Sequence, residues 1–182
     1  MKLEIELDIP YAAAGAIPPQ QSARLTCYLL PETDRIPDQR EKPLVLVCPG
    51  GGYAYRSERE AEPIAMQFLA AGMHAAILHY SVAPNRYPTA ALELAYAVQH
   101  IRRNAQALHV SHVFIIGFSA GGHLCATLGT LWKDPIFAAA LGDDFLWKPD
   151  AQLLCYPVIT LGEFAHAGSR ECLLGPNAPQ AL

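Results

Sequence analysis

The 182-residue sequence has little charge and no clustered positive charge. Only 16% of its residues are charged, and its formal net charge is −4. The longest run of basic residues is Arg102-Arg103. Such a run is too short to neutralise many phosphates, so the composition argues against nucleic acid as a partner. A small, nearly neutral molecule is the expected ligand, and a homo-oligomer is a possible assembly.

Long apolar runs and export signals are also missing. No apolar stretch approaches the roughly 20 residues needed to cross a bilayer. The alternating start MKLEIELDIP lacks the basic and apolar regions of a signal peptide. The five cysteines are odd in number and form no CxxC pair, and four of them, Cys27, Cys48, Cys125 and Cys155, lie in apolar runs. We therefore expect a cytoplasmic protein without membrane contact, whose thiols are buried and reduced.

Two common ligand signatures are absent. A dinucleotide-binding fingerprint would need glycine where Ser119 stands, and the phosphate-loop ending G-K-[ST] occurs nowhere. The histidine pairs His109/His112 and His74/His79 have no accompanying cysteine or carboxylate pattern. They are expected to pack or to face solvent. The sequence predicts no metal site and no cofactor.

The sequence does contain alternating strand and helix patterns. Hydrophobic residues make up 52% of the chain, enough for one sizeable core, so we expect a single domain over residues 1–182. Apolar segments with little alternation predict strands covered on both faces, as in a mostly parallel sheet with helices on both sides. These segments are 23–30, 43–48, 74–82, 112–118 and 151–159, and MKLEIELDIP reads as a further strand.

Three helices carry their own signals. Ser57 and Glu60 have the spacing of a capping box in front of a helix over 61–72. A second helix is expected to open at Pro88, with Ala91, Leu94, Val98 and Ile101 on one face. A third covers 120–131. Residues 133–150 are expected to be a looser connection, and the chain after residue 159 has too weak a period to assign an element.

The stretch HVFIIGFSAGGHL contains the candidate catalytic residues. Gly117-Phe118-Ser119-Ala120-Gly121 is a G-x-S-x-G sequence between a predicted strand and a predicted helix, the context that a nucleophile elbow requires. In that turn the serine backbone is strained and small neighbours leave room for the hydroxyl. We expect Ser119 to be a nucleophile and the Ala120 N–H to be the first oxyanion donor.

A second set of donors is expected from the glycine loop that follows the strand over 43–48. Glycine lets the backbone approach a ligand closely, so the N–H groups of Gly51 and Gly52 are candidates for the oxyanion hole. Tyr53, Tyr55 and Arg56 follow the loop. They either line an acyl or alcohol pocket or pack beneath the next helix. Alone, each pattern occurs by chance or simply closes a turn; together, in this order, they favour catalysis.

The segments PGGGY, YSVAP…YP, GFSAGGHL and PDAQLLCYPVIT resemble α/β-hydrolase-fold serine esterases of the hormone-sensitive-lipase and acetyl-xylan-esterase-like branch. The resemblance covers roughly residues 43–175. It implies an α/β-hydrolase fold whose first strands form an antiparallel edge. It also implies hydrolysis of a small acyl ester, plausibly an acetyl group on a sugar, by Ser119 with the Gly51, Gly52 and Ala120 amides.

The resemblance also implies that the acid and the histidine of the catalytic triad are missing from this sequence. In this fold the acid and the histidine follow the serine in the chain, after strands that come later than residue 159. We therefore expect a chain truncated at its C-terminal end, without the last strands. His123 is a fourth candidate for the pocket, although it is rather expected to pack or hydrogen-bond behind the elbow, and His166 could reach the pocket rim. No acid stands out among Asp134, Asp143, Asp144 and Asp150.

Two further alternatives stay open. A noncatalytic hydrolase-fold remnant could bind esters without turning them over. Within the enzymes, a peptidase or thioesterase could use the same turn, because one elbow serves many acyl transfers.

Overall fold

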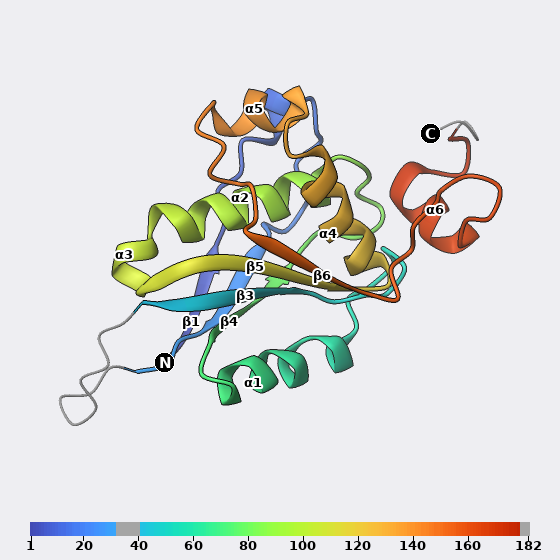
Figure 1. The fold of residues 1–182 in the computed structure, drawn as a ribbon. Helices are drawn as coiled ribbons and strands as arrows, with labels where there is room; N and C mark the ends of the chain where they lie inside the picture. Colours follow the sequence, from blue (N-terminus) through green and yellow to red (C-terminus); the bar gives the residue numbers. More distant parts are fainter. Residues whose placement is uncertain (32–40, 179–182) are drawn as a thin grey trace.

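A computed structural model describes residues 1–31 and 41–178. Six strands form one sheet in the order β1-β2-β4-β3-β5-β6 (Figure 1). Their bounds are β1 Lys2–Glu6, β2 Arg24–Tyr28, β3 Lys42–Cys48, β4 His74–His79, β5 Val110–Phe118 and β6 Ala151–Cys155. Strands β4, β3, β5 and β6 run parallel, whereas β1 and β2 are antiparallel. The expected mostly parallel sheet with an antiparallel edge is confirmed.

Helices cover both faces of the sheet. Helix α1 lies on one face, and α2, α3, α4 and α5 lie on the other side (Figure 1). The bounds are η1 Tyr11–Ala14, η2 Glu58–Glu60, α1 Glu62–Ala70, α2 Thr89–Arg103, α3 Ala105–Leu108, α4 Ala120–Leu131, α5 Pro135–Leu141 and α6 Ala167–Leu174. None of the helices in the described part of the chain has the length and apolar character of a membrane span.

Strand β3 contributes alternate side chains to two hydrophobic cores, one on each face of the sheet. Leu44 and Leu46 belong to the larger core beneath α2 and α4, and Val45 and Val47 belong to the smaller core beneath α1. Successive side chains of a strand point to opposite faces, so a strand buried on both sides is apolar throughout. The predicted face of α2, which includes Leu94 and Val98, is buried against the larger core.

Three expectations about local structure are wrong. The Ser57 side chain makes no capping hydrogen bond. It is followed by η2, α1 begins only at Glu62, and the Glu60 carboxylate accepts from the Gly50 N–H instead. Residues 133–150 contain a helix, α5, because Asp134 caps the Ile136 N–H at 2.9 Å and Pro135 occupies the first turn. Strand β6 ends at Cys155, not at residue 159, and its side chains are largely exposed, not covered on both faces.

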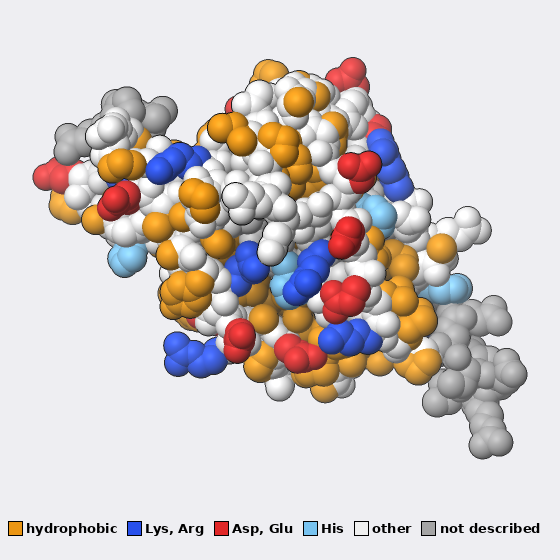
Figure 2. Space-filling model, turned by 180° about the vertical axis from the view of Figure 1, so that it is seen from behind, with side chains coloured by type: hydrophobic (Ala, Val, Ile, Leu, Met, Phe, Trp, Pro, Cys, Tyr) orange, Lys and Arg blue, Asp and Glu red, His pale blue; other side chains and the backbone are white. Residues whose placement is uncertain are grey.

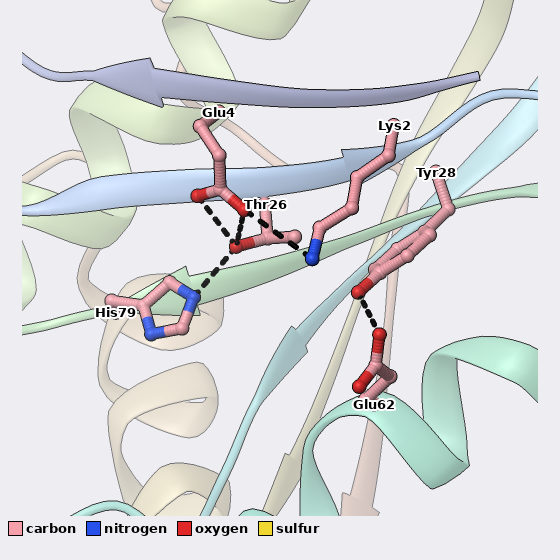
Figure 3. Close-up of polar contacts among 6 residues, drawn as sticks. All are labelled: Lys2, Glu4, Thr26, Tyr28, Glu62 and His79. Carbon is pink, nitrogen blue, oxygen red and sulfur yellow. Dashed lines mark hydrogen bonds and ion pairs between the residues drawn. The ribbon is translucent and has the colours of Figure 1, made fainter.

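Polar side chains lie on the part of the sheet that α1 leaves uncovered, on the same face as that helix (Figure 3). Thr26 Oγ1 donates to the Glu4 carboxylate at 2.9 Å and lies 2.8 Å from His79 Nε2. The threonine has one proton and the carboxylate only accepts, so the neutral His79 ring donates from Nε2. Nearby, the Tyr28 hydroxyl donates to Glu62 of α1. These bonds join β1, β2, β4 and α1.

His79 is expected to titrate far below an ordinary histidine. Burial, followed by the charges of Arg24 and Arg56, lowers its pKa from 6.5 to about 4. Because the folded-state pKa is the lower one, neutral His79 stabilises the fold above pH 6.5, and that contribution is lost as the pH falls from 6.5 to about 4. NMR titration of the ring protons measures this directly. A His79 midpoint at or above 6.5 would contradict it.

Candidate functional site

Ser119 lies at the junction of β5 and α4. Its φ of 50° and ψ of −114° place a non-glycine residue in a strained conformation, which costs about 1–3 kcal/mol and is retained where surrounding structure enforces it. The Ser119 N–H donates to the Cys155 carbonyl at 3.0 Å, and the Ser119 carbonyl accepts from the Val158 N–H at 3.1 Å. The turn is thus held by the segment that follows β6.

Glycines around Ser119 are required by close backbone contacts. A Cβ at Gly117 would overlap the Gly121 carbonyl, and one at Gly121 would overlap the Cys48 carbonyl. Strand β5, helix α4 and the end of β3 therefore meet at distances that only glycine permits. This packing explains the residue types that flank Ser119.

The glycine loop after β3 reaches the same place. A Cβ at Gly50 would lie 3.1 Å from the Ser119 Cβ, so the two segments are in contact. Gly51 and Gly52 have φ values of 126° and 65°, which glycine adopts readily. In the described part of the chain, the N–H groups of Gly51, Gly52 and Ala120 donate no hydrogen bond. These N–H groups lie in the loop that contacts Ser119 at Gly50 and at the first residue of α4.

Glu60 fixes the glycine loop, a role that its sequence position does not reveal. Its Oε2 accepts from the Gly50 N–H at 2.8 Å, and its Oε1 accepts from the Tyr156 hydroxyl at 2.8 Å. The hydrogen bond to Glu60, ahead of burial, raises the pKa of Tyr156 to about 12. One carboxylate therefore ties the loop after β3 to the segment after β6, with Ser119 between them.

The four candidate pocket residues have different positions. Tyr53 is 2% exposed and its hydroxyl lies 2.9 Å from His123 Nδ1. This bond behind the turn is the one expected for His123, and burial lowers the pKa of that ring. Tyr55 is 61% exposed. Arg56 is half-buried and donates to the Tyr80 carbonyl at 2.6 Å.

The remaining titratable candidates serve local structure. His166 Nδ1 lies 2.9 Å from the Ser169 hydroxyl and accepts from the Ser169 N–H at the start of α6. Asp144 bonds Arg103 and Asp150 bonds Arg102, each at the surface, while Asp134 caps α5. No group of three or more His, Cys, Asp or Glu side chains is placed to hold a metal ion within the described ranges.

Comparisons with known proteins identify the family of the chain. Residues 34–150 match the BD-FAE family. Over 153 residues the chain is 37% identical to endo-1,4-beta-xylanase B of Butyrivibrio fibrisolvens, covering 77% of this chain and 23% of that protein. The chain thus spans about a quarter of the length of that relative.

Solved structures are similar over nearly the whole chain. The acetyl ester-xyloside bifunctional hydrolase of Caldicellulosiruptor lactoaceticus has a TM-score of 0.80 and 33% identity, over 99% of this chain and 66% of that one. The carboxylesterase Cest-2923 of Lactobacillus plantarum has a TM-score of 0.76 and 30% identity, over 94% and 62%. The chain belongs to the BD-FAE family and has the α/β-hydrolase fold of these esterases.

Proposed function

We propose that this chain is part of a serine esterase that hydrolyses small acyl esters, acetyl esters above all, carried by carbohydrates. The observation that carries the proposal is the strained Ser119 in contact with the glycine loop at Gly50, where the N–H groups of Gly51, Gly52 and Ala120 donate to no described residue. The sugar is suggested by relatives whose names include a xylanase and an acetyl ester-xyloside hydrolase.

The proposed reaction proceeds through an acyl-enzyme. Ser119 Oγ attacks the ester carbonyl carbon while a base removes its proton, and the resulting oxyanion accepts hydrogen bonds from the Gly51, Gly52 and Ala120 amides. Collapse breaks the ester C–O bond, and the departing alcohol takes the proton. Water then attacks the acyl group, and the acid and free Ser119 are released.

The base and its acid partner are proposed to come from residues after Leu182. Within the described residues, His123 Nδ1 is bonded to Tyr53 and His166 Nδ1 to Ser169. Strand β6 offers an edge on which further strands of an α/β hydrolase can pair.

The five cysteines are free thiols, which supports a location in the reducing cytoplasm.

A fluorophosphonate probe tests the proposal. In a longer chain carrying the natural continuation beyond Leu182, we expect covalent labelling that mass spectrometry maps to Ser119. The 182-residue chain should label far more slowly, because removing a triad member costs about 10⁴–10⁶ in rate. Ser119→Ala is the control and should not label. If the longer chain stays unlabelled, the esterase proposal is wrong and the noncatalytic remnant is favoured.

A further inference from the structure

A large hollow lies away from Ser119, at the carboxyl end of β4. Its volume is about 1060 Å³, at the upper end of the range for small-molecule pockets. Its walls are residues 15–22 before β2 and residues 79–89 after β4, with Glu6, Arg24 and Arg56 beside them. Ser119 and the glycines of the adjacent loop are not among the described lining residues, so this is a separate site.

The positions of its charged side chains follow from strand pairing. Arg24 is paired with Glu6 on one side and with His79 on the other. Directly paired residues of antiparallel strands project to the same face, so these three side chains form a row across β1, β2 and β4. In Figure 2, the middle of this face of the molecule shows basic side chains on both sides of a histidine.

The hollow is positively charged in a negatively charged protein. Arg24, Arg56 and Arg86 line it together with Glu6 as the one carboxylate among its described residues, whereas the whole chain has a net charge of −4. The charges of Arg24 and Arg56 also contribute, after burial, to the low pKa of His79. The described lining residues thus carry three arginines and one carboxylate, and the Glu93 carboxylate, which accepts from the lining residue Ser81, adds a second negative charge that interacts with Arg56.

The guanidinium groups have donors to spare. Arg56 uses one nitrogen on the Tyr80 carbonyl, and Arg86 uses one on the Glu171 carbonyl at 2.9 Å. Arg24 makes no hydrogen bond or ion pair with the described residues. Each guanidinium carries five N–H donors in a fork that matches a carboxylate. Most of these donors therefore make no hydrogen bond with the described residues, although the Arg86 guanidinium also lies against Gly175.

Uncharged hydrogen-bonding groups complete the lining. They are the amides and hydroxyls of Gln20, Gln21, Ser22, Ser81, Asn85 and Thr89. Such groups both donate and accept hydrogen bonds, as the hydroxyls of a sugar do. A ligand with one carboxylate on a polyhydroxylated body would therefore satisfy both parts of the hollow.

We propose that this hollow binds a hexuronate sugar, whose carboxylate is held by the guanidinium groups of Arg24, Arg56 and Arg86. Charge-assisted, two-pronged arginine–carboxylate bonds are the strongest contacts available there. The site is independent of catalysis by Ser119, but it shares a wall with the catalytic loop: the Ala83 N–H donates to the Tyr53 carbonyl at 2.7 Å, and the Tyr80 hydroxyl donates to the Pro49 carbonyl at 2.5 Å.

Calorimetric titration of the 182-residue chain with methyl glucuronide tests the site. Methyl glucoside is the matched neutral ligand, and inorganic phosphate is the matched small anion. We expect the glucuronide to bind at least about tenfold more tightly than the glucoside, since charge-assisted hydrogen bonds are about twice as strong as neutral ones. Affinity for the glucuronide should also fall as salt is added.

Two variants locate the binding. Arg24→Gln should weaken glucuronide binding about tenfold, and Arg59→Gln, which removes an exposed charge outside the hollow, should leave it unchanged. Thermal unfolding verifies that each variant is folded, and Arg86→Gln replaces Arg24→Gln if that protein does not fold. Equal binding of glucuronide and glucoside, or equal effects of the two variants, would overturn the proposal. Tighter binding of phosphate than of the glucuronide would overturn it as well, because the sugar body would then contribute nothing.

Discussion

Replacing Gly121 with alanine is expected to destabilise the fold by about 3 kcal/mol, the upper end for overpacking. The added Cβ would overlap the Cys48 carbonyl and lie 2.6 Å from the Pro49 carbonyl oxygen. Both are backbone atoms of a central strand and its loop, so they cannot move aside at low cost. Thermal unfolding should occur about 6–12 °C lower, given the usual 2–4 °C per kcal/mol for a chain of this size.

Gly168→Ala is the matched control for that substitution. A Cβ at Gly168 would meet its nearest neighbour, His166, at an ordinary 3.5 Å. Alanine also favours the helical conformation by up to about 1 kcal/mol over glycine, so stability should be unchanged or slightly higher. If Gly121→Ala and Gly168→Ala melt at the same temperature, the close approach of α4 and β3 does not constrain position 121.

Replacing Glu60 with alanine is expected to slow the proposed acylation of Ser119 about 10- to 100-fold in a longer chain that continues beyond Leu182, because small misplacements of catalytic groups carry losses of this size. The substitution frees the Gly50 N–H and the Tyr156 hydroxyl, both of which Glu60 holds at 2.8 Å. The adjacent amides, which are proposed as oxyanion donors, then lose their fixed position. Single-turnover rates with an activated acetyl ester measure the effect, which should appear in the acylation rate more than in substrate affinity.

Two variants separate positioning from general damage. Glu60→Gln keeps an amide oxygen that can accept from Gly50, so it should recover part of the lost rate. Glu62→Gln alters the neighbouring acid of α1, which bonds Tyr28 rather than the loop, and it should leave the rate unchanged. A Glu60→Ala rate equal to that of Glu62→Gln would show that the loop is positioned without Glu60.

The turn at Ser119 could be predicted because its requirements are local and strict. Strand, glycine spacing and helix all occur in one short stretch, and the backbone contacts of Gly117 and Gly121 explain why those positions lack side chains. The alternating strands and helices were predictable for a similar reason, since burial on both faces demands nearly continuous apolar segments such as β3.

The roles of Glu60 and α5 could not be predicted with the same rules. Ser57 and Glu60 have the capping-box spacing, but a hydrogen bond to Gly50, ten residues away, takes the carboxylate. This tertiary contact leaves no local pattern. The sequence predicts a loose connection over 133–150, whereas Pro135 stands at the first turn of a short helix whose Phe137 is buried. Proline is compatible with both positions, so tertiary packing decides.

The backbone hydrogen bonds of Ser119 with the Cys155 carbonyl and the Val158 N–H mean that β6, an edge strand among those described, supports the turn at Ser119. Fraying of a sheet starts at an unpaired edge, where local opening requires the least free energy. Opening at β6 would therefore release the serine main chain before it disturbs the inner strands. Any partner strand that pairs with β6 would stiffen the turn at Ser119 without touching the substrate.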